Sequence, residues 1–399
     1  MELKIYAEKS WKKWFNRQTR NQYMRDVKID EYPNGIIVNE KLRGFGVFDK
    51  NYEFVKSSRQ VRKNNGQFIP NFKHTDIPYV DEDVVFVGNV YPQFGHFLLE
   101  HLNRAYAALD KKYQKMKFVL INNKSVEPVP EYMLVFLELL GIPRKNILVL
   151  DRTTQFKNVY VPVQGFNIPI YSSKAFGETF AKMAKSVKDN EKVYDKVYVS
   201  RAKLNTRKTY GEEKVQKIFE RNGFKVIYPE TMSLKEQIAT IKDCNFLAGC
   251  AGTALHMALF MKAGGTVIQI KRNKIYDDNA PTQWLLNETC GLNSVFINSS
   301  VERVKTGHGF NMPQIIGVNE NMRDFFKDFG FKTNDKDFEV DDIARQEYDT
   351  ALSKYQGEHG TKIVEFIKHK IVRISSCFIP GRYNRSVYRR WLKNKLGIV

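Results

Sequence analysis

The sequence predicts an α/β protein with two doubly wound domains that face a cleft, followed by a basic helical extension. Short apolar segments alternate with helical patterns in two separate series, which is typical of βαβ units and a parallel sheet. The length of 399 residues also favours more than one domain. We expect an N-terminal domain at residues 1–188, a second domain at 189–300 and the extension at 301–399.

The first series begins with a segment at 44–55 that indicates a β-hairpin. Apolar strands are predicted at 83–89, 117–122 and 146–151, with a helix at 131–141 between the last two. A polar helical stretch at 174–192 then precedes the second series, which places the domain boundary near residue 188.

The second series is the clearer of the two. Its strands are predicted at 196–200, 225–229, 245–249 and 266–271. Its helices are predicted at 211–223, 233–244 and 253–265. Ser233 followed by Glu236 forms a capping box, and Gly223 is placed to end its helix. Ligands of such sheets bind outside the carboxyl ends of the strands, so we searched those ends for functional residues.

Charge is concentrated at the two ends of the chain. The formal net charge is +20; residues 362–395 carry ten Lys or Arg against one acid, and residues 4–28 carry eight against two. No signal-peptide core precedes the first domain, and no stretch approaches the ~18 consecutive apolar residues of a membrane span. We therefore expect a cytoplasmic protein that contacts the inner face of the cell membrane.

Cations gather where the strand at 196–200 ends. Arg201, Lys203 and Arg207 follow that strand and precede a helix N-terminus. Such groups bind phosphate or pyrophosphate through charge-assisted hydrogen bonds. A solvated basic loop is the alternative interpretation.

A second segment, "LAGCAGTALHMALF" at 247–260, joins a strand to a helix. Gly249 and Gly252 let the backbone approach a ligand closely, and the helix N-terminus favours an anion. Glycines at such turns also serve packing alone, and His256 by itself fits a structural histidine as well as a functional one.

A third segment, "YPQFGHFLLEHLNRAYAAL" at 91–109, predicts a helix that starts near Gly95. One face of this helix is apolar, with Leu98, Leu102, Ala105 and Leu109. Another face carries His96, Glu100 and Asn103. An imidazole and a carboxylate one turn apart suit a general base, although a carboxylate also stabilises a helix N-terminus without any catalytic role.

These segments together resemble glycosyltransferase family 61. The resemblance rests on "HFLLE" (96–100), "SRAKLNTR" (200–207), "KEQI" (235–238) and "GCAGTALHMALF" (249–260), which occur in the family's order. It covers residues ~44 to 300. Ala251 and Met257 stand where many eukaryotic members carry His and Asn, so the sequence looks like the bacterial branch that makes capsular and other surface polysaccharides.

The resemblance implies a GT-B arrangement of two Rossmann-like domains and inverting transfer of a sugar from a nucleotide sugar. A UDP-sugar is favoured as donor, the acceptor is a glycan or glycolipid, and the sugar is a hexose, pentose or N-acetylhexosamine. Glu100 is the expected base, with His96 positioning it or the substrate. The implied substrate-binding residues are Arg201, Lys203, Arg207, Gly249, Gly252, Thr253, His256, Glu236 and Asn103.

No metal or other cofactor is expected. The acidic triplet at 81–83 precedes the predicted strand at 83–89 and so lies at the edge of the sheet opposite the cleft, as a solvated turn. The four cysteines show no C-x-x-C spacing, which argues against a zinc site. Arginines and helix N-termini can neutralise the leaving diphosphate instead.

Three other functions were weighed. A catalytically inactive sugar-nucleotide-binding protein and a nucleotide-dependent phosphotransferase both fit the fold, because fold does not determine function. The P-loop pattern is absent, which counts against a kinase. The basic charge suits nucleic acid, but no nucleic-acid-binding module is recognised, so we expect none as partner.

The tail suggests contact with an anionic membrane surface. Ile363, Ile367, Ile371 and Ile374 share one helical face, and the last stretch adds Tyr388 and Trp391 beside further cations. The alternative for the isoleucine segment is a helix packed back on the first domain. We predict membrane contact only for residues 383–399.

Overall fold

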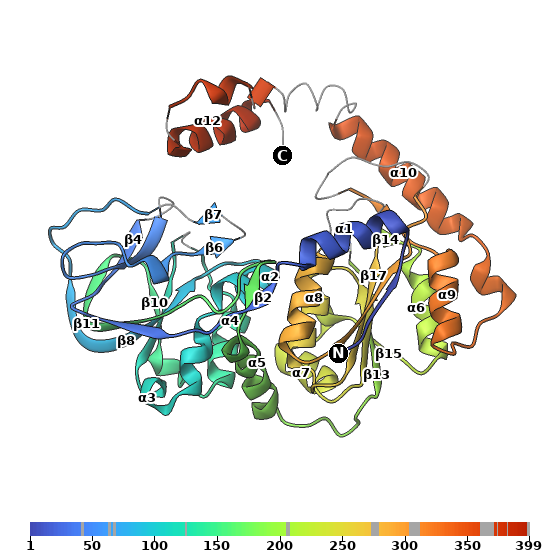
Figure 1. Cartoon of the computed structure of the whole chain (residues 1–399), viewed down its shortest axis with the longest axis horizontal. Coiled ribbons are helices and arrows are strands. Elements are labelled where there is room, and N and C mark those ends of the chain that lie inside the picture. Colours follow the sequence, from blue (N-terminus) through green and yellow to red (C-terminus); the bar gives the residue numbers. More distant parts are fainter. Residues whose placement is uncertain are drawn as a thin grey trace.

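Two β-sheets with associated helices lie side by side in the computed structural model (Figure 1). The structure describes the chain except residues 41–43, 63–64, 67–68, 124–125, 205–207, 273–278, 303–311, 360–370, 373, 381 and 397–399. Within this described part, no helix combines the length and apolarity that crossing a membrane requires.

The second sheet has six strands, and every neighbouring pair is parallel. In spatial order they are β1 (Leu3–Tyr6), β18 (Asn293–Asn298), β17 (Thr266–Lys271), β16 (Phe246–Cys250), β13 (Lys196–Val199) and β15 (Lys225–Ile227). Apolar runs form such strands because both faces of the sheet are covered. The predicted parallel series over 196–271 is confirmed.

Helices cover both faces of this sheet (Figure 1). On one face α6 (Glu212–Arg221) and α9 (Glu320–Asp328) bury a phenylalanine-rich core. On the other lie α7 (Leu234–Ile241), the 3₁₀ helix η6 (Thr253–Phe260) and α8 (Ala280–Thr289). Alternate residues of β13 face the two cores, Val197 one and Tyr198 the other.

Segments outside residues 189–300 also build this half. Strand β1 pairs with β18, with Leu3 opposite Ser294, and α1 (Lys9–Thr19) packs Phe15 against Phe296. Helix α9 comes from the predicted extension. The boundaries at 188 and 300 stay predictions. A strand from the start of the chain and a helix from residues 320–328 complete this half.

The first sheet departs from the predicted doubly wound form because it is mixed. Strands β10 (Ile147–Leu150), β9 (Lys117–Ile121), β8 (Tyr79–Asn89) and β11 (Thr154–Pro162) are parallel neighbours, whereas β3 (Ile29–Pro33), β4 (Ile36–Glu40) and β5 (Gly44–Phe48) add antiparallel pairs. The segment 44–55 begins with β5, and Phe48 and Phe54 form an antiparallel bridge within it, which confirms the predicted hairpin. Phe45 and Val47 of β5 belong to one apolar cluster with Val84 and Phe86, and among the described residues this cluster includes no residue of a helix.

The other face of the first sheet carries helices. They are the π-helical turn η2 (Phe97–His101), the 3₁₀ helix η3 (Ala105–Leu109) and α4 (Glu131–Leu139). The remaining elements are β2 (Tyr23–Met24), β6 (Val61–Arg62), β7 (Asn65–Gly66), β12 (Tyr171–Ser172), β14 (Thr209–Tyr210), β19 (Gln314–Ile315), α2 (Phe94–His96), α3 (Lys111–Gln114), α5 (Lys174–Ser186), α10 (Asp342–His359), α12 (Arg382–Lys395), η1 (Lys56–Ser58), η4 (Arg144–Asn146), η5 (Pro229–Thr231) and η7 (Asp335–Phe338).

One apolar core runs through both halves. Phe260 at the end of η6 stacks on Phe136 of α4, with ring centroids 6.2 Å apart, and meets Phe180 of α5 edge-on at 5.3 Å. All three rings are buried. The helix predicted as polar at 174–192 thus has an apolar face, and this shared core sets the position of one sheet relative to the other.

Candidate active site

Two predicted segments meet at the carboxyl edge of the second sheet. Strands β13 and β16 are neighbours, so Arg201 and Gly252, each two residues past a strand end, lie side by side. A Cβ atom on Gly252 would lie 3.1 Å from Nη1 of Arg201. Glycine at position 252 therefore makes room for the guanidinium group.

A buried carboxylate anchors Arg201. Glu212, at the start of α6, is fully buried, and its Oε1 accepts a hydrogen bond of 2.9 Å from the Arg201 backbone N–H. Burial raises the pKa of Glu212, and the positive charge of Arg201 opposes that rise. Nε of Arg201 is buried without a hydrogen-bond acceptor in the described part of the chain, so this side chain can still receive an anionic ligand.

Arg272 is a second cation at this edge, which the sequence reasoning missed. It directly follows β17, the other neighbour of β16, and its Nη1 donates to Thr209 Oγ1 at 3.2 Å. Its charge acts on Glu212 together with that of Arg201. An arginine immediately after the predicted strand at 266–271 was the available signal.

The helix predicted from Gly95 begins at Phe94 and widens after one turn. Leu102 N–H bonds to Phe97 O at 2.8 Å, five residues back, which is a π-helical turn. His96 Nδ1 lies 2.5 Å from Glu100 Oε1. Glu100 is 8% exposed. The predicted pairing of the imidazole and the carboxylate on one face is thus present.

Arg62 is another group that the sequence reasoning missed. Its Nε lies 3.8 Å from Glu100 Oε1. It comes from β6, far from the motif in sequence, and no sequence pattern marks it. Arg104 is fully buried and holds the segment that precedes Arg62. It donates hydrogen bonds of 3.0–3.1 Å to the carbonyl oxygens of Ser57, Arg59 and Pro162 and to the side chain of Gln60.

Asn103 is used within the protein fold. Its amide donates to the carbonyl oxygens of Leu99, Glu100 and Phe166 at 3.0–3.1 Å, and the residue is 1% exposed. Because both N–H groups are engaged, the structure gives Asn103 a role in holding the π-helical turn and does not bring it to the face of His96.

The two halves touch at Gly95 and Thr253. A Cβ atom on Gly95 would lie 2.5 Å from Thr253 Cγ2 and 2.9 Å from its Oγ1. Thr253 directly follows Gly252, which contacts Arg201. One chain of contacts therefore links the His96–Glu100 pair to the arginine.

His256 lies one turn beyond Thr253 in η6. Its Nδ1 is 2.9 Å from Gln283 Oε1, and the residue is 6% exposed. Burial lowers the pKa of His256 to about 4, and the nearby His96 acts in the same direction. The imidazole is therefore neutral near pH 7.

Lys203 and Glu236 are not joined to this cluster. The exposed Lys203 holds its Nζ 3.9 Å from the centroid of the Tyr228 ring. Glu236 is exposed and forms the predicted capping box, its carboxylate accepting the Ser233 N–H at 2.7 Å. Arg207 lies outside the described residues.

Gly249 lies inside β16 and not at a ligand-facing turn. A Cβ atom there would lie 2.8 Å from the carbonyl oxygen of Val199 on the paired strand. The close approach of the two strands accounts for this glycine without a ligand.

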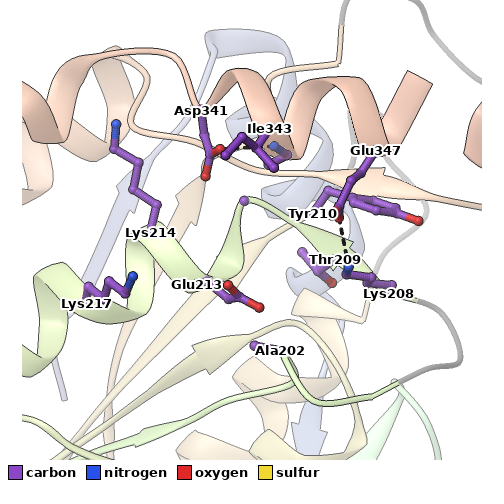
Figure 2. Close-up of a pocket in the computed structure, with 12 residues that line it drawn as sticks. Ala202, Lys208, Thr209, Tyr210, Glu213, Lys214, Lys217, Asp341, Ile343 and Glu347 are labelled. Carbon is purple, nitrogen blue, oxygen red and sulfur yellow. Dashed lines mark hydrogen bonds and ion pairs between the residues drawn. The ribbon is translucent and has the colours of Figure 1, made fainter. Parts of the chain in front are cut away.

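A pocket of about 370 Å³ opens between α6 and the start of α10 (Figure 2), and Arg201 is not among the residues that line it. Ala202 lines it. The pocket is lined by equal numbers of lysines and acidic residues, namely Lys208, Lys214 and Lys217 and, opposite in charge, Glu213, Asp341 and Glu347. Lys208 is already paired with Glu347 at 2.9 Å, and Lys214 Nζ bonds to the Glu339 carbonyl oxygen. This charge balance makes the pocket a weaker anion site than the arginine pair.

The acidic triplet at 81–83 lies within β8, which corrects the predicted turn. Asp83 accepts a hydrogen bond from Asn158 at 2.7 Å, and Asp81 pairs with Lys157 at 3.6 Å, both on the adjacent strand β11. Cross-strand pairing lets acidic residues extend a strand beyond its apolar part. Across the described residues, no three His, Cys, Asp or Glu side chains gather as a metal site would need.

Comparison with known proteins identifies one family. The family model of glycosyltransferase 61 matches residues 94–268, somewhat less than half of the chain. No curated protein matches the sequence. The matched segment includes His96, Glu100, Arg201, Gly252 and His256. The match supports the assignment of this chain as a glycosyltransferase. Glycosyltransferases of this family use a nucleotide-sugar donor and a glycan acceptor. Arg62 and Arg272 lie outside the matched segment.

The contact between the halves predicts the effect of a methyl group at position 95. Gly95→Ala should lower the free energy of unfolding by about 1–3 kcal/mol, because the new methyl overlaps Thr253. The same change in a Thr253→Ala background should cost less, since both close atoms are gone. Chemical denaturation of the two single variants and the double variant measures this coupling.

Gly357 in α10 provides the control, because a Cβ atom there meets nothing within 4 Å. Gly357→Ala should leave stability unchanged or raise it by up to ~1 kcal/mol. Equal costs of Gly95→Ala in both backgrounds would show that positions 95 and 253 are not in contact.

The lowered pKa of His256 predicts a pH dependence of stability. In the unfolded chain the imidazole titrates near 6.5, and in the fold near 4, so between these values the unfolded state binds more protons. Stability should fall as pH falls through this window, by at most ~1.4 kcal/mol per pH unit for this group. Urea denaturation at pH 7 and pH 5 should show a smaller loss in His256→Gln; parallel losses would contradict the assignment.

Proposed function

We propose that this chain is an inverting glycosyltransferase that moves a sugar from a nucleotide sugar to a glycan or glycolipid. The observation that carries the proposal is the contact of Gly95 with Thr253, which places an imidazole–carboxylate pair beside an arginine cluster. The family match supports it. A UDP-sugar donor and a role in bacterial surface polysaccharide synthesis, including capsule, follow from the resemblance alone.

Glu100 acts as the general base in this proposal. It removes the proton of the acceptor hydroxyl while the hydroxyl oxygen attacks the anomeric carbon, and the bond from that carbon to the diphosphate breaks. The nucleoside diphosphate leaves with the bonding electrons, and attack opposite the leaving group inverts the anomeric centre. His96, 2.5 Å from Glu100, and Arg62 orient the carboxylate.

Arg201 and Arg272 stabilise the leaving diphosphate. Negative charge grows on the leaving group as the bond breaks, and positioned cations lower the energy of that state. Two guanidinium groups next to one buried carboxylate leave a net positive charge for the ligand. We therefore propose that the reaction needs neither metal nor other cofactor.

The test measures release of nucleoside diphosphate. A thermal-shift screen with UDP, GDP and CDP first finds the nucleotide that raises the melting temperature. The matching nucleotide sugars, with a glycan acceptor and excess chelator, should then yield nucleoside diphosphate. Loss of turnover with chelator and its return with manganese or magnesium would overturn metal independence. Nucleotide binding without turnover would indicate an inactive sugar-nucleotide-binding protein.

Glu100→Gln is the control for the chemistry. It should keep nucleotide binding and stability and lose at least ~100-fold in turnover, the lower end of what acid–base groups contribute. Near-normal turnover in this variant together with an inactive His96→Ala would move the role of base to His96.

We also propose that residues 383–399 contact the anionic inner face of the cell membrane. Val387 and Trp391 are exposed in this stretch, and Ile371, Ile374 and Phe378 are exposed just before it. Arginines and lysines lie beside them on α12. Exposed apolar groups next to cations suit the membrane interface. Ile363 and Ile367, which the sequence places on the same face, lie outside the described residues.

Flotation with phosphatidylglycerol vesicles tests this contact. The full chain should float with these vesicles and much less with neutral phosphatidylcholine vesicles. Deleting residues 383–399 should abolish most of the flotation, whereas unchanged flotation after the deletion would refute the proposal.

A further inference from the structure

A line of uncharged polar side chains runs from His256 into the interior of the second half. Nδ1 of His256 lies 2.9 Å from Gln283 Oε1, and Gln283 Nε2–H donates to Asn287 Oδ1 at 2.9 Å. Asn287 Nδ2–H then donates to Ser294 Oγ at 2.7 Å. Gln283 and Asn287 lie on α8 and Ser294 on β18, so a helix and a strand hold the line in place.

These amides occupy positions that suit apolar residues. Gln283 and Asn287 are fully buried, on the same helix as the buried Leu285 and Leu286. Burying an amide is costly unless its hydrogen bonds are made, and a fully bonded network rigidifies its members. The line of bonds ends on His256, one turn from the contact between the two halves. Its effect is therefore to fix that imidazole.

The direction of the bonds determines which ring nitrogen carries the proton. Because the oxygen of Gln283 faces Nδ1, Nδ1 bears the hydrogen, and Nε2 of the neutral ring keeps its lone pair. Burial lowers the pKa of His256 to about 4, so this form persists at neutral pH. Nε2 is then a hydrogen-bond acceptor and not a donor.

We propose that Gln283, Asn287 and Ser294 position His256 so that its Nε2 accepts a hydrogen bond from one hydroxyl group of the donor sugar. This inference rests on the proposed function. The transferred sugar must lie between the diphosphate at Arg201 and the acceptor hydroxyl at Glu100, and η6 with His256 begins where these two regions meet. The three positioning residues lie outside the matched family segment.

The protonation of the ring can be observed without any substrate. In protein labelled with ¹⁵N-histidine, the His256 signals, assigned among the seven histidines with His256→Gln, should show a protonated Nδ1 and a bare Nε2 at pH 7. Gln283→Leu should lose this tautomer. Gln216→Leu, which removes another buried helical glutamine, should keep it. A protonated Nε2 in the wild type, or an unchanged tautomer in Gln283→Leu, would overturn the proposal.

Kinetics then test the role at the donor. Gln283→Leu should raise KM for the donor roughly 3- to 10-fold, the value of one hydrogen bond, with KM for the acceptor unchanged. Ser294→Ala removes one hydroxyl and little volume, and it should show a smaller change in the same direction if Gln283→Leu does not fold. A deoxy donor that lacks the recognised hydroxyl should be insensitive to both changes.

The two kinds of failure are distinguishable. Loss of the tautomer with an unchanged donor KM would overturn contact with the donor hydroxyl. If no nucleotide sugar were turned over, the proposed function would fall, and the NMR result would still decide whether the polar line positions His256.

Discussion

The close approach of Gly95 to Thr253 is the constraint on which the rest of the site depends. At position 95, no side chain larger than hydrogen fits between α2 and the start of η6. The backbone of Gly95 therefore contacts the side chain of Thr253 directly. The shared core around Phe260 holds them in this position. Residues that lie more than a hundred positions apart in sequence are thereby brought together, with the His96–Glu100 pair on one side of the contact and arginines on the other.

The electrostatic arrangement follows from which groups are buried. Burial raises the pKa of Glu212, the nearby charges of Arg201 and Arg272 oppose that rise, and the carboxylate group fixes the loop after β13 through a backbone hydrogen bond. Across the junction, Glu100 is almost buried beside His96 and Arg62. A neutral imidazole at position 256 adds no charge between these two clusters. Under the proposed function, the transferred sugar would meet a polar but uncharged side chain there.

Local pattern predicted four of the six strands of the second sheet, without β1 and β18, and missed much of the first sheet. Strands such as β17 are continuous apolar runs bounded by Gly and polar residues, which is how a strand buried on both faces reads in sequence. The start of β8 is acidic, and this local pattern predicts a turn. These residues form a strand because they pair with β11, which is a tertiary contact that the local sequence does not reveal. The His96–Glu100 pair followed from helical spacing, although the π-helical turn after it did not. Arg62 reaches the site through folding alone, and no single-sequence pattern distinguishes it from other surface cations; the one signal for Arg272 was its place directly after the predicted strand at 266–271.

The pairing of β1 with β18 has a consequence for the order in which the chain can fold. Leu3 lies opposite Ser294, so this strand must stay unpaired during synthesis until nearly three hundred further residues have been made. A contact of such long sequence separation is slow to form and is lost early when the chain opens. The exposed edge of β18 would meanwhile be open to pairing with other chains. The first half, whose strands all lie between residues 29 and 162, can assemble before this happens. Completion of the second sheet is therefore expected as a late folding step, and β1 is the strand whose delay would most expose newly made protein to aggregation.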